Sequence, residues 1–152
     1  MKAKPSDQKS AEPRPSDFDK ALFFQALGDK TRLRLLNLMG DREICVCYFV
    51  EILEQGQPKI SRHLAYLRRA GIVAARREGK WMHYRIVTPP SIGAAKVLRR
   101  TLKWLFEDPA MQTDRARLEK ACCRPEKFVA LQGAPRPVAV DASVAAKAIL
   151  GT

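Results

Sequence analysis

The stretch QPKISRHLAYLRRAGIVAARREGKWMHYRIV, residues 57–87, decides the fold of this 152-residue chain. Its first half places apolar residues at spacings of three and four, and Pro58 suits the first turn of a helix. After Gly71 the pattern changes to that of β-strands, and Glu78-Gly79 is a hairpin signal. We therefore predict a basic helix followed by a β-hairpin. The expected strands are residues 72–77 and 80–87.

The residues before this stretch predict three more helices. The first begins at Ser16 or Asp17 and ends at Gly28, and the second runs from an Asp29 cap to Gly40. The third covers about residues 46–54. The third helix, a short turn and the basic helix make a helix-turn-helix, and the hairpin adds a wing.

The residues after the hairpin predict a long helix and then a shorter one. Five apolar residues recur at helical spacing after the Pro89-Pro90 pair, and Pro109 ends that helix. The stripe is wider than one small core needs, which favours a dimer interface. A further helix is expected from about Met111 to Ala121. The apolar stripe consists of Ile92, Ala95, Leu98, Leu102 and Leu105.

The predicted fold class is mainly α with a small β-hairpin (α+β), as a homodimeric winged helix-turn-helix. The division of the chain follows from composition, because the first residues are rich in proline and charge and the last are rich in proline, alanine and valine. The expected parts are a disordered tail (1–16), a DNA-binding and dimerisation domain (17–107), a helix ending in a cysteine pair (108–123) and a C-terminal extension (124–152) that is either flexible or packed over the body.

The charge distribution favours a nucleic-acid partner. The chain carries a formal net charge of +12, and residues 57–85 hold eight basic residues against Glu78 alone. Such a cluster favours a double-stranded DNA partner over the alternative of a basic protein whose charges are spread evenly over a solvated surface. Side chains near the start of a groove-reading helix reach base edges, and Arg62 suits guanine. Basic residues at the hairpin tip are expected to lie along the DNA backbone or in the minor groove. The candidate DNA-binding residues are Gln57, Lys59, Ser61, Arg62, His63, Arg68, Arg76, Arg77 and Lys80.

Two of these features have plainer interpretations. Any single Arg or Lys is about as consistent with a solvated surface charge. His63 is better explained as a half-buried residue that packs the helix than as a metal ligand. No phosphate-binding glycine loop, carboxylate pair beside a histidine or nucleophile motif is present, so the sequence does not predict an enzyme.

Cys45 and Cys47 lie one residue apart at the entrance of the helix-turn-helix. Thiolates are soft ligands that select thiophilic elements. Residues two apart on a regular helix point to nearly opposite sides, so one ion takes both sulfurs only where the backbone is extended or distorted. The alternative is a pair of inert buried cysteines. No run long enough to span a membrane and no signal peptide is present, so we expect a cytoplasmic protein with reduced cysteines and no membrane partner.

Three segments of the chain carry a recognisable pattern: ALGDKTRLRLL (26–36), EICVC (43–47) and ISRHLAYLRRAGIV (60–73). Together they resemble the ArsR/SmtB metalloregulators, over about residues 17–107. The resemblance implies a homodimeric repressor that binds a palindromic operator and releases it when a metal or metalloid binds. Cys45-Val46-Cys47 looks like the arsenic-sensing motif on the third helix, so arsenic(III) is the expected inducer.

One position departs from the family pattern. Many arsenic-responsive members have a third cysteine where this chain has Val50. Cys122 and Cys123 are therefore also candidate ligands. Three interpretations stay open: they complete the Cys45/Cys47 site, they form a separate site, or they are incidental. A two-thiolate site for methylarsenite, another thiophilic metal such as cadmium or lead, and redox sensing stay open as alternatives. The resemblance also disfavours a zinc site on the long helix. The zinc sensors that the chain resembles bind the metal there with Asp and His, and residues 91–106 contain neither.

Overall fold

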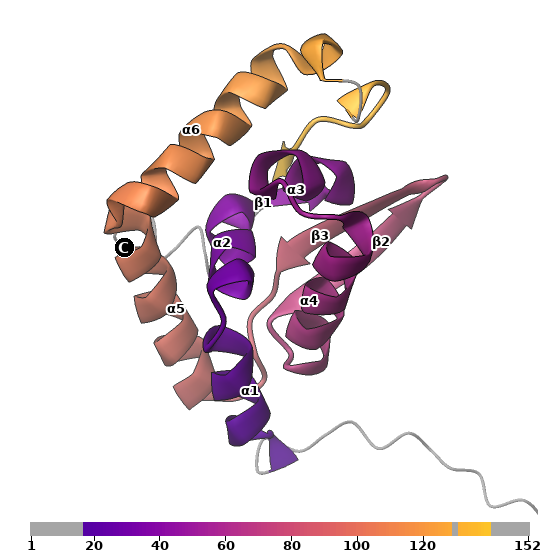
Figure 1. Cartoon of the computed structure of the whole chain (residues 1–152). Coiled ribbons are helices and arrows are strands. Elements are labelled where there is room, and N and C mark those ends of the chain that lie inside the picture. Colours follow the sequence, from indigo (N-terminus) through magenta and orange to yellow (C-terminus); the bar gives the residue numbers. More distant parts are fainter. Residues whose placement is uncertain (1–16, 129–130, 141–152) are drawn as a thin grey trace, which may run out of the picture.

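The computed structural model describes residues 17–128 and 131–140. The expected tail 1–16 and part of the expected extension therefore lie outside the described residues. Figure 1 shows helices packed on one side of a small twisted sheet, with α5 and α6 forming an outer arm. The described elements are α1 (Lys20–Leu27), α2 (Lys30–Met39), β1 (Arg42–Cys45), α3 (Val46–Leu53), α4 (Gln57–Arg69), β2 (Val73–Glu78), β3 (Trp81–Ile86), α5 (Ile92–Glu107), α6 (Pro109–Cys123), η2 (Pro125–Lys127) and β4 (Val138–Ala139).

Helices α3 and α4 form the predicted helix-turn-helix. The turn between them begins at Glu54, which ends α3 in the left-handed conformation with φ 52° and ψ 42°. Helix α4 then starts after Gly56 with Pro58 in its first turn, where a missing N–H costs no hydrogen bond. Its apolar face, Ile60, Leu64 and Leu67, is fully buried. With the β2–β3 hairpin behind it, the winged helix-turn-helix is confirmed.

The sheet is larger than predicted. It has the strand order β2-β3-β1-β4, and the sequence pattern missed β1 and β4. The hairpin turn was also predicted one residue too early, because Glu78 pairs with Trp81 and the turn residues are Gly79 and Lys80. Gly79 has φ 57°, which glycine adopts without strain at the first position of a two-residue turn.

The helices around the core follow their capping residues. Asp19, rather than Ser16 or Asp17, caps α1 by accepting from the Leu22 N–H, and Asp29 caps α2 as expected. The apolar stripe of α5 is buried except at its first member, Ile92, which is 77 % exposed. Helix α6 begins before the expected Met111, because Asp108 caps it and Pro109 is its first residue, and it ends at the cysteine pair.

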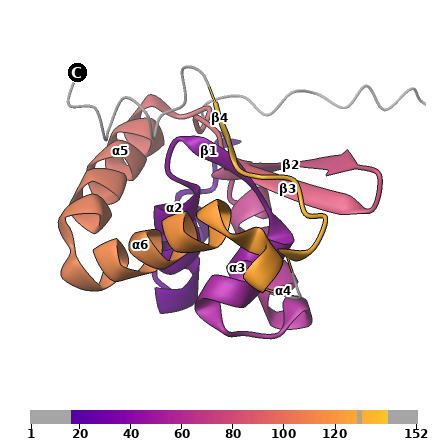
Figure 2. The same cartoon turned by 90° about the horizontal axis from the view of Figure 1, so that it is seen from above.

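Helix α6 is fixed across α2 and α3 (Figure 2). Its anchor is an ion pair in which the Arg34 guanidinium donates to both Asp114 carboxylate oxygens, at 2.7 and 3.0 Å. Past α6, the chain returns to the sheet, and β4 pairs with the free edge of β1 through Arg42↔Ala139 and Glu43↔Val138. None of the described helices combines the length and apolar character needed to cross a membrane.

Candidate thiol site and nucleic-acid interface

Cys45 and Cys47 meet at the junction of a strand and a helix. Cys45 is the last residue of β1 and also the N-cap of α3, with extended φ −66° and ψ 141°. Because its backbone is not helical, its side chain is not directed away from that of Cys47, and the two Sγ atoms lie 2.9 Å apart. The junction therefore meets the geometric condition for two sulfurs to bind one ion.

The two thiols share a proton unequally. A hydrogen bond with Cys47, opposed by burial and helped by N–H groups at the start of α3, lowers the pKa of Cys45 to about 7. The same hydrogen bond and burial raise the pKa of Cys47 well above its ordinary value. Near neutral pH the pair thus offers one nucleophilic thiolate beside one thiol that holds its proton.

The second cysteine pair is arranged differently. Cys122 and Cys123 end α6, where Cys122 is half-buried against the core and Cys123 is exposed. Burial raises the pKa of Cys122, so this thiol is protonated at neutral pH. Among residues 17–128 and 131–140, no three His, Cys, Asp or Glu side chains converge as metal ligands. The structure brings Cys45 and Cys47 together but does not add Cys122 or Cys123 to them.

Tyr48 is a buried residue at this site that the sequence pattern missed. Its side chain is fully buried, and its hydroxyl has no hydrogen-bond partner in the described part of the chain. Burial raises the pKa of this phenol, and electrostatic interactions with the Cys122, Cys45 and Cys47 thiols act in the same direction. Tyr48 therefore lies within electrostatic reach of both cysteine pairs, and its place beside Cys47 in the sequence was the only available signal.

The predicted groove-reading residues lie on the free face of α4. Gln57, Lys59, Arg62 and Arg68 are exposed, and Ser61 is half-exposed on the first turns. These side chains stand opposite the buried Ile60 face, so the helix presents donors outward while its back holds it to the body. This is the arrangement that insertion of a helix into the major groove requires.

His63 lies toward the body instead. Its Nδ1 is 3.3 Å from Arg32 Nη1 and 3.7 Å from Asp29 Oδ1. Burial lowers the pKa of His63, with the Asp29 carboxylate opposing. Arg32 in turn donates to the carbonyls of Ala26 and Gln25. His63 therefore braces α4 against the start of α2, which agrees with its plainer interpretation.

The predicted wing residues differ from one another. Arg77 and Lys80 are exposed at the hairpin tip, and Lys80 Nζ lies 4.9 Å from the centre of the Trp81 ring. Arg76 instead donates twice to the Glu43 carboxylate of β1, at 2.8 and 2.6 Å. Glu43 was missed because β1 was missed.

Comparison with known proteins places the chain in a family. A model described as "Bacterial regulatory protein, arsR family" matches residues 29–75. The arsenical resistance operon repressor of Escherichia coli (strain K12) is 40 % identical over 102 residues, which cover 66 % of this chain and 86 % of that protein. The arsenic resistance transcriptional regulator ArsR2 of Pseudomonas putida is 47 % identical over 90 residues, or 56 % of this chain and 78 % of that protein.

Among solved structures, reduced HlyU from Vibrio cholerae N16961 is similar with a TM-score of 0.48 and 28 % identity. The match covers 58 % of this chain and 88 % of that one. The predicted family and the absence of an enzymatic role are confirmed by the sequence relatives. The chain belongs to the bacterial ArsR family of transcriptional regulators.

Proposed function

We propose that this protein is an arsenic(III)-responsive repressor that holds operator DNA as a homodimer and releases it when arsenic binds Cys45 and Cys47. The observation that carries the proposal is the 2.9 Å sulfur–sulfur contact at the junction of β1 and α3. Two soft donors already lie within reach of one thiophilic ion there. The names of the relatives, which include arsenical and arsenic resistance regulators, support the same inducer class.

The chemistry is ligand exchange. The Cys45 thiolate displaces one hydroxide ion from arsenous acid, and the Cys47 thiol displaces a second hydroxyl group, which leaves as water with the thiol proton. Two As–S bonds form and two As–O bonds break, and the released hydroxide ion takes a proton from the solvent buffer. No third donor among the described side chains converges on the pair, so hydroxide completes the coordination. Methylarsenite suits the same two sulfurs, with its methyl group in the third position.

Arsenic capture acts on the helix-turn-helix because of where Cys45 sits. This one residue ends β1 and caps α3, so holding its sulfur and that of Cys47 at bonding distance from one atom constrains both elements. Helix α3 packs directly on α4, and Phe49 and Leu64 belong to the same buried core. Since close-packed cores transmit displacement, a shift of α3 moves α4 out of register with the groove.

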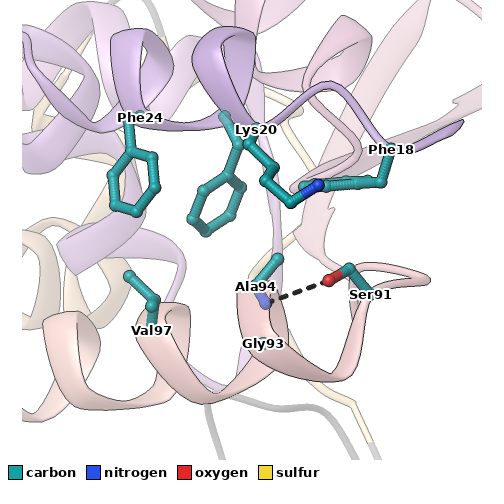
Figure 3. A pocket seen from close by; sticks show the side chains of 8 residues that line it. Phe18, Lys20, Phe24, Ser91, Gly93, Ala94 and Val97 are labelled. Carbon is teal, nitrogen blue, oxygen red and sulfur yellow. Dashed lines mark hydrogen bonds between the residues drawn. The ribbon is translucent and has the colours of Figure 1, made fainter. Parts of the chain in front are cut away.

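The homodimer is proposed through the outer face of α1 and α5. A hollow of about 230 Å³ lies between these helices, and Figure 3 shows Phe24 of α1 facing Val97 of α5 across it. A second hollow of about 420 Å³ shares Phe24 and Val97 and continues to Trp104. Phe24 and Trp104 are 57 % and 76 % exposed, and a second copy of the chain would cover them.

Redox sensing is a second candidate, favoured by the thiolate beside a thiol. Hydrogen peroxide would oxidise the two sulfurs to a disulfide, and the peroxide would be reduced to two water molecules. An operator-binding assay with arsenite, methylarsenite, cadmium, lead and peroxide in separate arms tests both candidates. We expect release by the arsenicals under reducing conditions. Release by peroxide alone, with the arsenicals inert, would replace arsenic sensing by redox sensing.

The DNA interface has its own test in Arg62. If this exposed side chain reads guanine, Arg62→Ala weakens operator binding by about 1–3 kcal/mol and relaxes base preference at one position. Arg124→Ala removes an exposed arginine at the end of α6 and serves as the matched control. Equal losses in both variants would show a general charge effect without base reading.

A further inference from the structure

We propose that the wing, through Glu43, is a second route by which the thiol pair controls DNA binding. This inference rests on the proposed function and names Glu43 as a positioning residue for the wing. The route runs along β1, away from α3, and it ends at the basic hairpin tip.

The first step is the strand register. In the described sheet, β1 meets β3 through two residue pairs, Ile44↔Tyr84 and Cys45↔His83. Cys45 therefore belongs to one of the two residue pairs that join the wing to β1. On the next strand, His83 pairs in turn with Arg76 of β2. Residues paired across an antiparallel sheet share a face, so Cys45, His83 and Arg76 form one row across three strands.

The second step is an ion cluster on the same face. Glu43 precedes Cys45 by two residues and so points to the same side of β1. Its carboxylate accepts two hydrogen bonds from Arg76 and one from Arg85 at 3.4 Å. The Glu43 side chain is only 13 % exposed, so solvent screens this cluster less than a fully exposed pair. Burial raises the pKa of Glu43, but the arginine contacts outweigh it and hold that pKa below its ordinary value.

The third step is the packing of His83 between the ion cluster and the hairpin tip. His83 is 4 % exposed, and its Nε2 lies 3.0 Å from Glu78 Oε2 without the alignment of a hydrogen bond. Glu78 also contacts Arg76 and is the last residue before the turn. A buried imidazole leaves little room for β1 and β3 to move separately. Displacement of Cys45 is therefore passed to β3 and β2 together.

The consequence is that occupancy of the thiol pair sets the position of the wing. With free thiols, Glu43 fixes Arg76 and the hairpin to the body, which aims Arg77 and Lys80 at the DNA backbone. When one arsenic atom binds both sulfurs, the end of β1 shifts, and Glu43 shifts with it. The hairpin tip then no longer aligns with the DNA phosphates, and α4 no longer fits the major groove.

The test is Glu43→Gln in the full-length protein, with arsenite and an operator duplex as probes. The measured quantity is the ratio of operator affinities without and with saturating arsenite. Because allosteric effects are typically about 5–150-fold, we expect this ratio to fall by about fivefold or more in the variant, while arsenite affinity of the DNA-free protein stays the same. Hydrogen exchange in residues 73–86 should quicken with arsenite in the wild type, and without arsenite in the variant.

The matched control is Glu119→Gln. It breaks an ion pair of 2.7 Å to Arg42, which lies on the same strand but faces α6 and not the wing. This control should keep the wild-type ratio and wing exchange. Arg76→Gln opens the cluster from its exposed side and should lower the ratio as Glu43→Gln does, even if the latter folds poorly.

The outcomes separate the two claims. The wing route would be overturned if wild type, Glu43→Gln and Arg76→Gln all bind arsenite and release the operator with the same ratio of operator affinities, and if hydrogen exchange in the wing is unchanged. That result would leave the proposed function intact. A wild type that binds arsenite without releasing the operator, or does not bind it, would overturn the proposed function itself.

Discussion

The two cysteine pairs of this chain contrast sharply. Cys45 and Cys47 are separated by one residue, yet their sulfurs are in contact, because a strand ends and a helix begins between them. Cys122 and Cys123 are adjacent, yet one is half-buried and the other exposed, because both lie on α6. Backbone conformation, and not separation along the chain, decides which thiols can share a ligand.

The largest expected effect comes from breaking the first pair. Cys45→Ser and Cys47→Ser should each keep operator binding but abolish its response to arsenite, because one sulfur alone forms no chelate. Fluorescence anisotropy of a labelled operator gives both quantities. Cys123→Ser, at an exposed position, is the control and should respond as the wild type does. Loss of operator binding without arsenite would instead show that the pair is structural.

The next prediction tests whether the two cysteine pairs act independently, by weakening the attachment of α6 to the body. Asp114 is buried and receives two hydrogen bonds from Arg34, so Asp114→Asn should lower the free energy of unfolding by about 2 kcal/mol. Urea denaturation measures this loss. The arsenite response should survive in the folded variant, since Cys45 and Cys47 lie on other elements. An arsenite response lost along with stability would mean that α6 belongs to the sensing site.

The sequence predicts the helices and the hairpin well because their signals are local. Asp29 and Pro58 mark helix starts, and the apolar spacing of α4 marks its buried face. The four-residue strand β1 has no such signal, since its partners lie about 40 residues further on in β3 and about 95 residues further on in β4. The Glu43–Arg76 contact depends on that tertiary packing, and so does the burial of the Tyr48 hydroxyl without a partner among the described residues. Residue pattern alone does not reveal either feature.

A smaller effect is expected from the second pair. Replacing both Cys122 and Cys123 by serine should weaken arsenite binding by no more than about tenfold, or 1.4 kcal/mol. X-ray absorption at the arsenic edge should count the same number of sulfur neighbours in this variant and in the wild type. One sulfur fewer in the variant would make a C-terminal cysteine the third ligand, from the same subunit or its partner.

The smallest effect concerns pH. The pKa of Cys45 is lowered to about 7, so its thiolate forms as pH rises through that value and is lost as pH falls below it. The difference in thiolate ultraviolet absorbance between wild type and Cys45→Ser should therefore rise with a midpoint near pH 7. A midpoint near the ordinary thiol value of 9.0 would show that Cys47 does not stabilise the Cys45 thiolate.

The most direct measurement follows bound arsenic and bound operator in one titration of the wild-type protein. Arsenite is added stepwise to the preformed protein–operator complex under reducing conditions, and both quantities are read at each step. We predict that the operator dissociates in proportion to arsenic uptake and that release is complete at one arsenic per protomer. A complex that takes up arsenic to saturation and still holds its operator would contradict the account.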